Sequence, residues 1–291
     1  GGTGSVPATA VRQPDGGFRV TGESTFISGC WNAEWCFMPA PEVEEGQDIR
    51  DADMRTMRMR FMHRSEWEIV ETWDVAGIRG SGSDTVRADG ALVRPEHGEV
   101  DLVALPPHFD NPVFRIPIPL RLSYNKVAIA LGIARGALDA FVDLAHHKVP
   151  MLSPSKLTDR PIAQIRVAEC EAKYRAVRAY VMEAMTEVED ELHRGAEQPS
   201  ALTTQNARLA CIVATNTCME LVDVLHNTAG TSASYMANPL ERKLRDAHAA
   251  ASHRWVSHSL YQELGAIIMG QDPSDEFAGT GGPGLGSRLR G

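Results

Sequence analysis

The period of the hydrophobic pattern changes once along this chain, and that change limits the folds that the chain can adopt. Before about residue 118, apolar and polar residues alternate in short stretches, as in Met57–Phe61 and Thr85–Val93. Such alternation is typical of half-buried strands. After the proline-dense stretch Pro112–Pro119, apolar residues recur at helical spacing, beginning with Val127 and Leu131. We therefore expect an α+β fold, in which a small antiparallel β domain precedes a helical bundle.

The positions of glycine, proline and apolar residues give approximate bounds for these elements. Turns are expected at Gly16-Gly17 and Asp89-Gly90. The expected strands are Phe18–Thr21, Met57–Phe61, Trp67–Val75 and Thr85–Val93. The expected helices run from about Val127 to Ala145, Pro161 to Leu192, Ser200 to Asn227 and Pro239 to Met269. Because the links are short, these helices predict an antiparallel four-helix bundle. The predicted domains are a β domain over 1–118, the bundle over 119–271 and a glycine-rich, disordered tail over 272–291.

The third expected helix is apolar on more than one face. Its apolar residues are Leu209, Ile212, Val213, Leu221, Val222, Val224 and Leu225. A helix of this kind is buried on several sides. We expect the bundle to form a homo-oligomer.

Charge and cysteine content argue against several classes of protein. The formal net charge of −9 argues against nucleic-acid binding, which needs a basic surface. No run of eighteen apolar residues occurs, so no membrane span is expected. The five cysteines show no repeated spacing, and we expect buried, reduced thiols in a cytoplasmic protein. The chain starts without methionine and enters strand-like sequence almost at once, as a fragment would.

Three short segments are richer in special residues than structure alone requires. The first, Thr25–Cys30, places a serine and a glycine at the end of an expected strand. The second, Trp73–Ser83, combines small residues with an arginine, so its amides and hydroxyls can hold an anion or a polar ring edge. The third, Ala229–His253, places two histidines among alanines. Each segment alone also has an ordinary interpretation: a strand end, a turn-rich connector, and structural helix histidines.

Taken together, the three segments resemble those of the acyl-CoA dehydrogenase superfamily. The motifs are Phe-x-Ser-Gly, Ala-Gly-x-Arg-Gly-x-Gly-Ser and Pro-Leu-x-Arg followed by Arg-Asp-x-His and a second His. More narrowly, the chain resembles the flavin-dependent monooxygenases of that superfamily, which include two-component aromatic hydroxylases. The resemblance covers residues 8 to about 271. It implies FMN or FAD, used in reduced form as a cosubstrate, a separate flavin reductase, and a small aromatic or related substrate. It also implies that the homo-oligomer is a tetramer.

The resemblance also assigns roles to individual residues. It implies that Ser28 contacts flavin N5 and that His253 serves as a base or manages the substrate proton, with a pKa near neutrality. The residues implied to bind the cofactor are Ser28, Gly29, Arg79, Gly80, Ser81, Gly82, Ser83, Gln164 and Gly230. Of these, Gln164 resembles a position near the cofactor of a neighbouring subunit.

Two departures from the superfamily leave alternatives open. Its N-terminal helical domain has no counterpart here, so the chain could be a non-catalytic flavin-binding or oligomerising fragment. Acyl-CoA dehydrogenases commonly carry a catalytic glutamate after the Arg-Asp pair, where this chain reads Ser252-His253-Arg254-Trp255. That change favours a monooxygenase, although an acyl-CoA dehydrogenase with its base elsewhere remains the alternative.

A metal site is not expected. His248, His253 and His258 are spaced by five residues, so on one helix each would be rotated by about 140° from the last. No His-Glu-x-x-His motif occurs.

Overall fold

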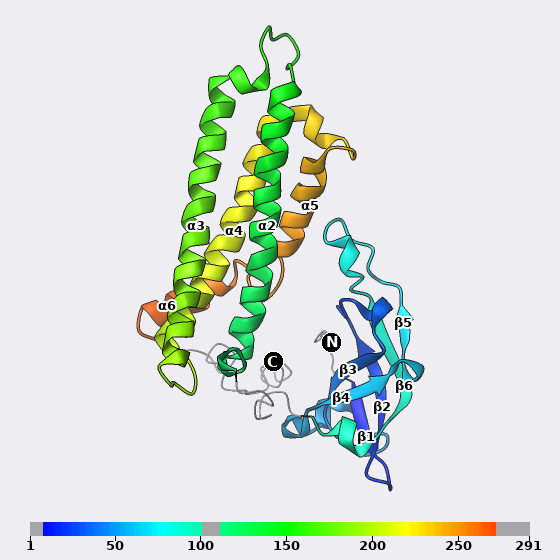
Figure 1. The fold of residues 1–291 in the computed structure, drawn as a ribbon. Helices are drawn as coiled ribbons and strands as arrows, with labels where there is room; N and C mark the ends of the chain where they lie inside the picture. Colours follow the sequence, from blue (N-terminus) through cyan, green and yellow to red (C-terminus); the bar gives the residue numbers. More distant parts are fainter. Residues whose placement is uncertain (1–7, 101–110, 272–291) are drawn as a thin grey trace. The chain divides into compact units, whose positions relative to one another are not determined.

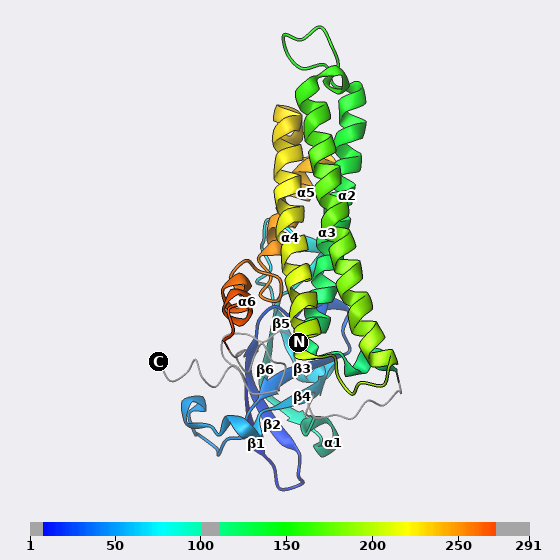
Figure 2. The same ribbon diagram turned by 90° about the vertical axis from the view of Figure 1, so that its left-hand side faces the viewer.

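A computed structural model describes residues 8–100 and 111–271 of the chain. The described residues form two compact units, a β unit of residues 8–75 and 79–100 and a helical unit of residues 76–78 and 111–271. Figures 1 and 2 show the strands of the first and the long helices of the second. The predicted α+β class is confirmed. The predicted tail over 272–291 lies outside the described residues.

The β unit contains two antiparallel sheets. The first has the strand order β1-β2-β6-β5, formed by β1 (Thr9–Arg12), β2 (Phe18–Ser24), β6 (Thr85–Val93) and β5 (Glu68–Val70). The second pairs β3 (Trp35–Ala40) with β4 (Arg58–His63). Gly16, with φ of 85°, makes the expected turn between β1 and β2, because glycine adopts positive φ at no steric cost.

Three expectations about the strands were wrong. The strand expected over Trp67–Val75 is confined to β5, Glu68–Val70. No turn interrupts β6 at Asp89-Gly90, since the pairing with β2 absorbs an irregularity between Val20 and Gly22 and then continues to Val93. In β4 the alternation of apolar and basic residues does not place Arg60 outward. Arg60 is fully buried, lies 3.9 Å from the centre of the Phe18 ring and donates to the carbonyls of Ala40 and Gly98. Burial lowers the pKa of its guanidinium to about 10.

The helical unit is built on α2 (Ile118–His147), α3 (Pro161–His193), α4 (Ala201–Ala229), α5 (Pro239–Ala251) and the shorter α6 (Leu260–Ile268). The first four lie side by side in both views (Figures 1 and 2), as predicted for a four-helix bundle. No strand occurs in residues 111–271. The expected fourth helix is wrong beyond Ala251, because the chain leaves the helix there and re-enters one at Leu260.

Helix α4 is the centre of the bundle. It packs against α2, α3, α5 and α6, and fifteen of its residues are buried. Its several apolar faces are therefore covered within one chain. Ala201–Ser234 is long and apolar enough to span a membrane by length and composition alone, a weak signal because buried core helices pass the same test. The five cysteines are free and buried, as expected.

Candidate functional site

The first two segments singled out in the sequence meet in the β unit. The end of β2 pairs with the start of β6, with Ser24 opposite Val86. The residues that follow β2 and precede β6 are therefore brought together. The hydroxyls of Ser28 and Ser83 lie 2.7 Å apart, those of Ser81 and Ser83 also lie 2.7 Å apart, and the Gly29 N–H donates to the Ser81 carbonyl over 2.9 Å.

The three hydrogen-bonded hydroxyls of Ser28, Ser83 and Ser81 extend from the interior to the surface. Ser83 is buried, Ser81 is half-buried and Ser28 is exposed. Gly29 and Gly80 are exposed as well, and a Cβ built on either would meet no atom within 4 Å. A planar ligand can thus approach the backbone while Ser28 donates or accepts a hydrogen bond at its polar edge. These residues fit a flavin ring, the group that the sequence resemblance implies.

Two residues at this site, Asp84 and Trp31, were missed in the sequence. The Asp84 carboxylate accepts hydrogen bonds from the N–H groups of Thr72 (2.8 Å) and Trp73 (2.7 Å) and from the Trp31 indole (2.7 Å). The Trp31 indole, followed by the Trp73 N–H, holds the pKa of Asp84 below its usual value. Asp84 thereby ties the 72–73 segment to the Ser28 segment. The only sequence signal was an aspartate placed directly after Gly-Ser-Gly-Ser.

Phe26 carries backbone strain next to Ser28. Its φ is 60°, a region that residues other than glycine, asparagine and aspartate seldom adopt. The Phe26 carbonyl accepts the Ser28 N–H over 3.0 Å, and its ring meets Trp73 edge-on at 6.1 Å. Such strain persists where surrounding contacts determine the conformation, and it clusters at functional sites.

His253 lies beyond the end of α5, in the break before α6. The expectation that it shares a helix with His248 is therefore wrong. Ser252 is the C-cap of α5, and its hydroxyl donates back to the His248 carbonyl, a local bond that competes with continued helix.

Buried side chains from neighbouring helices hold this break in place. Ser123 of α2 donates to the Trp255 carbonyl over 2.7 Å, and Asn216 of α4 donates to the Val256 carbonyl over 3.4 Å. Val256 is fully buried in the bundle core. The break is therefore a packed part of the bundle.

The environment of His253 keeps its ring neutral. Burial, then the positive charges of Lys126 and Arg254, lower the pKa of His253 to about 4. This differs from the expected value near neutrality. The ring Nδ1 lies 3.4 Å from the Trp255 N–H, which donates to it. Because Nδ1 accepts, the proton of the neutral ring is assigned to Nε2, which makes Nε2 a hydrogen-bond donor.

The other predicted residues of the helical unit have local partners. Gln164 donates from its side chain to the Thr158 carbonyl over 2.9 Å at the start of α3. Gly230 caps α4 with φ of 61° and ψ of −153°, its N–H bonded to Asn227. His248 pairs with Asp223 at 2.8 Å and is half exposed. Gly230 precedes α5 and His253 follows it, so these two residues are separated by about 20 Å of helix.

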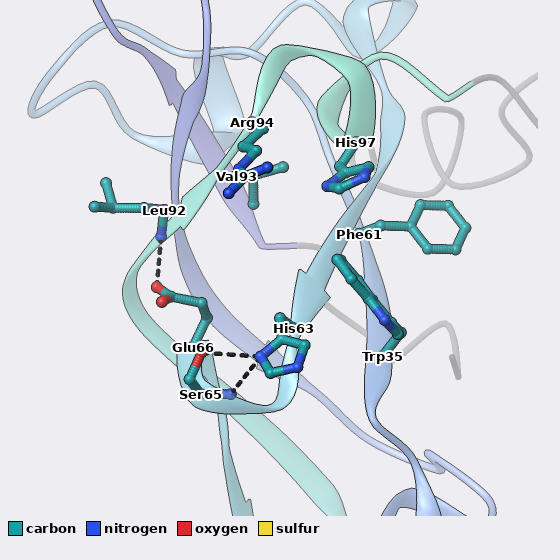
Figure 3. Close-up of a pocket in the computed structure, with 9 residues that line it drawn as sticks. All are labelled: Trp35, Phe61, His63, Ser65, Glu66, Leu92, Val93, Arg94 and His97. Atoms are coloured by element: carbon teal, nitrogen blue, oxygen red, sulfur yellow. Dashed lines mark hydrogen bonds between the residues drawn. The ribbon is translucent and has the colours of Figure 1, made fainter.

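A concavity of about 370 Å³ lies elsewhere on the β unit. Trp35 meets the rings of His63 and His97 edge-on at 5.3 and 4.9 Å (Figure 3). The residues that line this concavity are Trp35, Phe61, His63, Ser65, Glu66, Leu92, Val93, Arg94 and His97. It contains none of the residues predicted for the cofactor. Within residues 8–100 and 111–271, no three metal-ligating side chains gather in one place.

A protein-family model matches most of the helical unit. The model of the acyl-CoA dehydrogenase C-terminal domain matches residues 125–258. This range covers most of α2, all of α3 to α5, and the break that contains His253.

Two similar proteins of known function are named as monooxygenases or their subunits. Indole-3-acetate monooxygenase of Pseudomonas putida is 29% identical over 271 residues, which are 93% of this chain and 67% of that protein. The oxygenase subunit HsaA of a flavin-dependent monooxygenase from Mycobacterium tuberculosis is 30% identical over 247 residues, 82% of this chain and 61% of that protein. The chain thus spans about two thirds of the length of these relatives.

Solved structures share the fold. The crystal structure of the M. tuberculosis HsaA monooxygenase matches with a TM-score of 0.78 and 25% identity, covering 95% of this chain and 71% of that one. XiaF from a Streptomyces species, in complex with FADH2 and glycerol, matches with a TM-score of 0.80 and 22% identity, covering 94% and 69%.

Proposed function

Because this chain is similar to flavin-dependent monooxygenases and matches the acyl-CoA dehydrogenase C-terminal domain, we propose that it belongs to that branch of the superfamily and uses reduced flavin and O2 to hydroxylate a small aromatic substrate. The observation that carries the proposal is the hydroxyl chain of Ser28, Ser81 and Ser83 beside the exposed backbone of Gly29 and Gly80. When bound, reduced flavin supplies the two electrons that activate O2.

In this proposal Ser28 contacts the polar edge of the flavin ring. Its hydroxyl is exposed, and the hydrogen bond with Ser83 fixes its position. A hydroxyl held in place can act as donor or acceptor without reorganising, which is the requirement for a contact to a ring nitrogen. Arg79, Gly80, Ser81, Gly82 and Ser83 form the neighbouring loop.

His253 acts on the substrate oxygen as a hydrogen-bond donor. With a pKa of about 4 its ring is neutral at neutral pH, so it is a weaker base than a phenolate. Donation from Nε2–H would instead lower the pKa of a phenolic hydroxyl, so that its proton is lost to solvent and the more nucleophilic phenolate remains. Removing such a donor typically slows a reaction by about 10²- to 10³-fold.

The oxidation of a thioester is disfavoured by the residues around His253. That reaction removes a proton next to a carbonyl and needs a strong base. The stretch Ser252–Trp255 contains no carboxylate, and the one titratable ring within it is a weak base. A monooxygenase needs no such base.

The proposal includes partners. Relatives such as the HsaA subunit are named as oxygenase subunits, so a separate reductase would supply reduced FMN or FAD. A homotetramer is also proposed. Exposed apolar residues on α3, such as Ile162 and Ile165 at 52% exposure each, are better candidates for its interface than the covered faces of α4.

Isotope labelling tests the proposed reaction. The chain would be mixed with chemically reduced FMN or FAD, a phenolic or indolic acid and ¹⁸O2, and the product analysed by mass spectrometry. We expect one ¹⁸O atom in the product for at least one substrate. Conversion of butyryl-CoA to its enoyl product, without oxygen incorporation into any aromatic acid, would overturn the proposal.

A further inference from the structure

The short segment Ala76–Ile78 is held directly against helix α5. The Asp246 carboxylate accepts the Ile78 N–H over 2.7 Å. The Arg245 guanidinium donates to the Ala76 carbonyl and is itself fixed by two bonds to Glu241, of 2.6 and 2.7 Å. The segment is therefore fixed at both ends by side chains of one helix.

Gly77 allows the segment to pass this close to the helix. A Cβ at Gly77 would collide with the Arg245 carbonyl and would lie 3.0 Å from the Ala249 side chain. Glycine is required here because of close packing between two backbones. Gly77 and the Arg245-Asp246 pair thus belong to one contact. Within it, the bonded residues Ile78 and Asp246 are 168 positions apart in the sequence.

Ile78 is strained at the point where this contact ends. Its φ is 53°, a left-handed conformation that is a true outlier for a β-branched residue. Its side chain packs against the bundle core, and its N–H is held by Asp246. The next residue, Arg79, begins the short 3-10 helix Arg79–Ser81.

We propose that Asp246 is a positioning residue for the cofactor: by holding Ile78 in its left-handed conformation, it sets the course of the chain into Arg79–Ser83. The proposal rests on the proposed function, which assigns that loop to the flavin. Asp246 itself need not touch flavin or substrate. Its effect passes through the Ile78 backbone to the hydroxyls of Ser81 and Ser83.

Hydrogen exchange and flavin affinity, measured on the whole chain, test this proposal. In Asp246→Ala, amides in peptides covering 76–84 should exchange about tenfold faster, because a charge-assisted hydrogen bond is lost. The dissociation constant for reduced FMN should rise by about tenfold. Asp246→Asn keeps an acceptor oxygen and should change either quantity by less than about threefold.

Two further variants serve as comparisons. Asp223→Ala removes a carboxylate of α4 that pairs with His248, a residue of the same helix as Asp246. This variant should leave the exchange rate and the flavin affinity unchanged. Asp246→Glu keeps the charge but displaces the carboxylate by one methylene. If Asp246→Ala does not fold, Asp246→Glu should show the same two changes to a smaller extent.

The outcomes separate this proposal from the proposed function. If exchange in 76–84 is no faster in Asp246→Ala than in Asp223→Ala, Asp246 does not fix the Ile78 backbone and the proposal is overturned. Faster exchange with unchanged flavin affinity overturns the positioning role. If the unsubstituted chain binds neither reduced FMN nor reduced FAD, the proposed function fails and the positioning role fails with it, whatever the exchange data show of the contact itself.

Discussion

At the scale of single residues, Ser28 is the proposed contact to the flavin ring. Its hydroxyl is exposed but held by Ser83. We expect Ser28→Ala to raise the dissociation constant for reduced flavin by about three- to tenfold, the effect of one hydrogen bond. Equilibrium titration under anaerobic conditions measures it. Ser65→Ala removes an exposed serine that bonds to His63, and a similar loss of affinity in that variant would contradict the role of Ser28.

His253 should make the stability of the protein depend on pH. Its pKa is about 4 in the folded chain and 6.5 without burial, so the unfolded chain binds a proton first as the pH falls. The stabilisation from the neutral ring is complete above pH 6.5 and is lost as the pH falls toward 4. The midpoint of thermal unfolding should therefore fall more steeply over this window in the wild type than in His253→Asn. Equal slopes would contradict the buried, neutral ring.

The residues of the candidate site differ in how far the sequence could predict them. Ser28 and the 79–83 loop were singled out because serine and glycine next to a strand end are a local signal. Asp84 and Trp31 were not, since their role depends on which strands pair. The pKa of His253 could not be predicted either, because it is lowered mainly by burial in the folded chain and then by Lys126, which lies far away in the sequence.

At the scale of elements, the break between α5 and α6 depends on buried hydroxyl and amide groups. Ser123 is fully buried and donates to the Trp255 carbonyl. Ser123→Ala leaves that carbonyl without this donor and should lower the free energy of unfolding by about 1–3 kcal/mol. Urea denaturation provides the measurement. Thr186→Ala removes a similar bond from an exposed helix position and should lower the free energy of unfolding by less than about 0.5 kcal/mol. A comparable loss of unfolding free energy in both variants would contradict the role of the buried Ser123 hydroxyl.

The expected bounds of the helices were wrong where tertiary contacts outweigh the local preference of the sequence. Helices α2, α3 and α4 follow from the spacing of apolar residues, and their ends lie close to proline or glycine. The fourth expected helix was carried through Ser252–Ser259 because serine and histidine do not exclude helix. Ser123 and Asn216 then stabilise the open turn from other helices, which no local pattern reveals.

At the scale of the whole molecule, the apolar residues left exposed on α3 bear on assembly. Ile162 and Ile165 are three residues apart and so lie on one face, next to Gln164. We expect light scattering to give the mass of a tetramer, and Ile165→Glu to give a smaller species, because a buried charge without a partner is costly. A stable monomer before substitution would contradict the proposed assembly.

The central claim is that the Ser28 and 79–83 segments hold reduced flavin. The most direct measurement is hydrogen exchange by mass spectrometry, with and without reduced FMN or FAD under anaerobic conditions. We expect slower exchange in peptides covering 26–31 and 79–84, with little change in the concavity around Trp35 and His97. Protection confined to that concavity, or absent from both segments at saturating flavin, would contradict it.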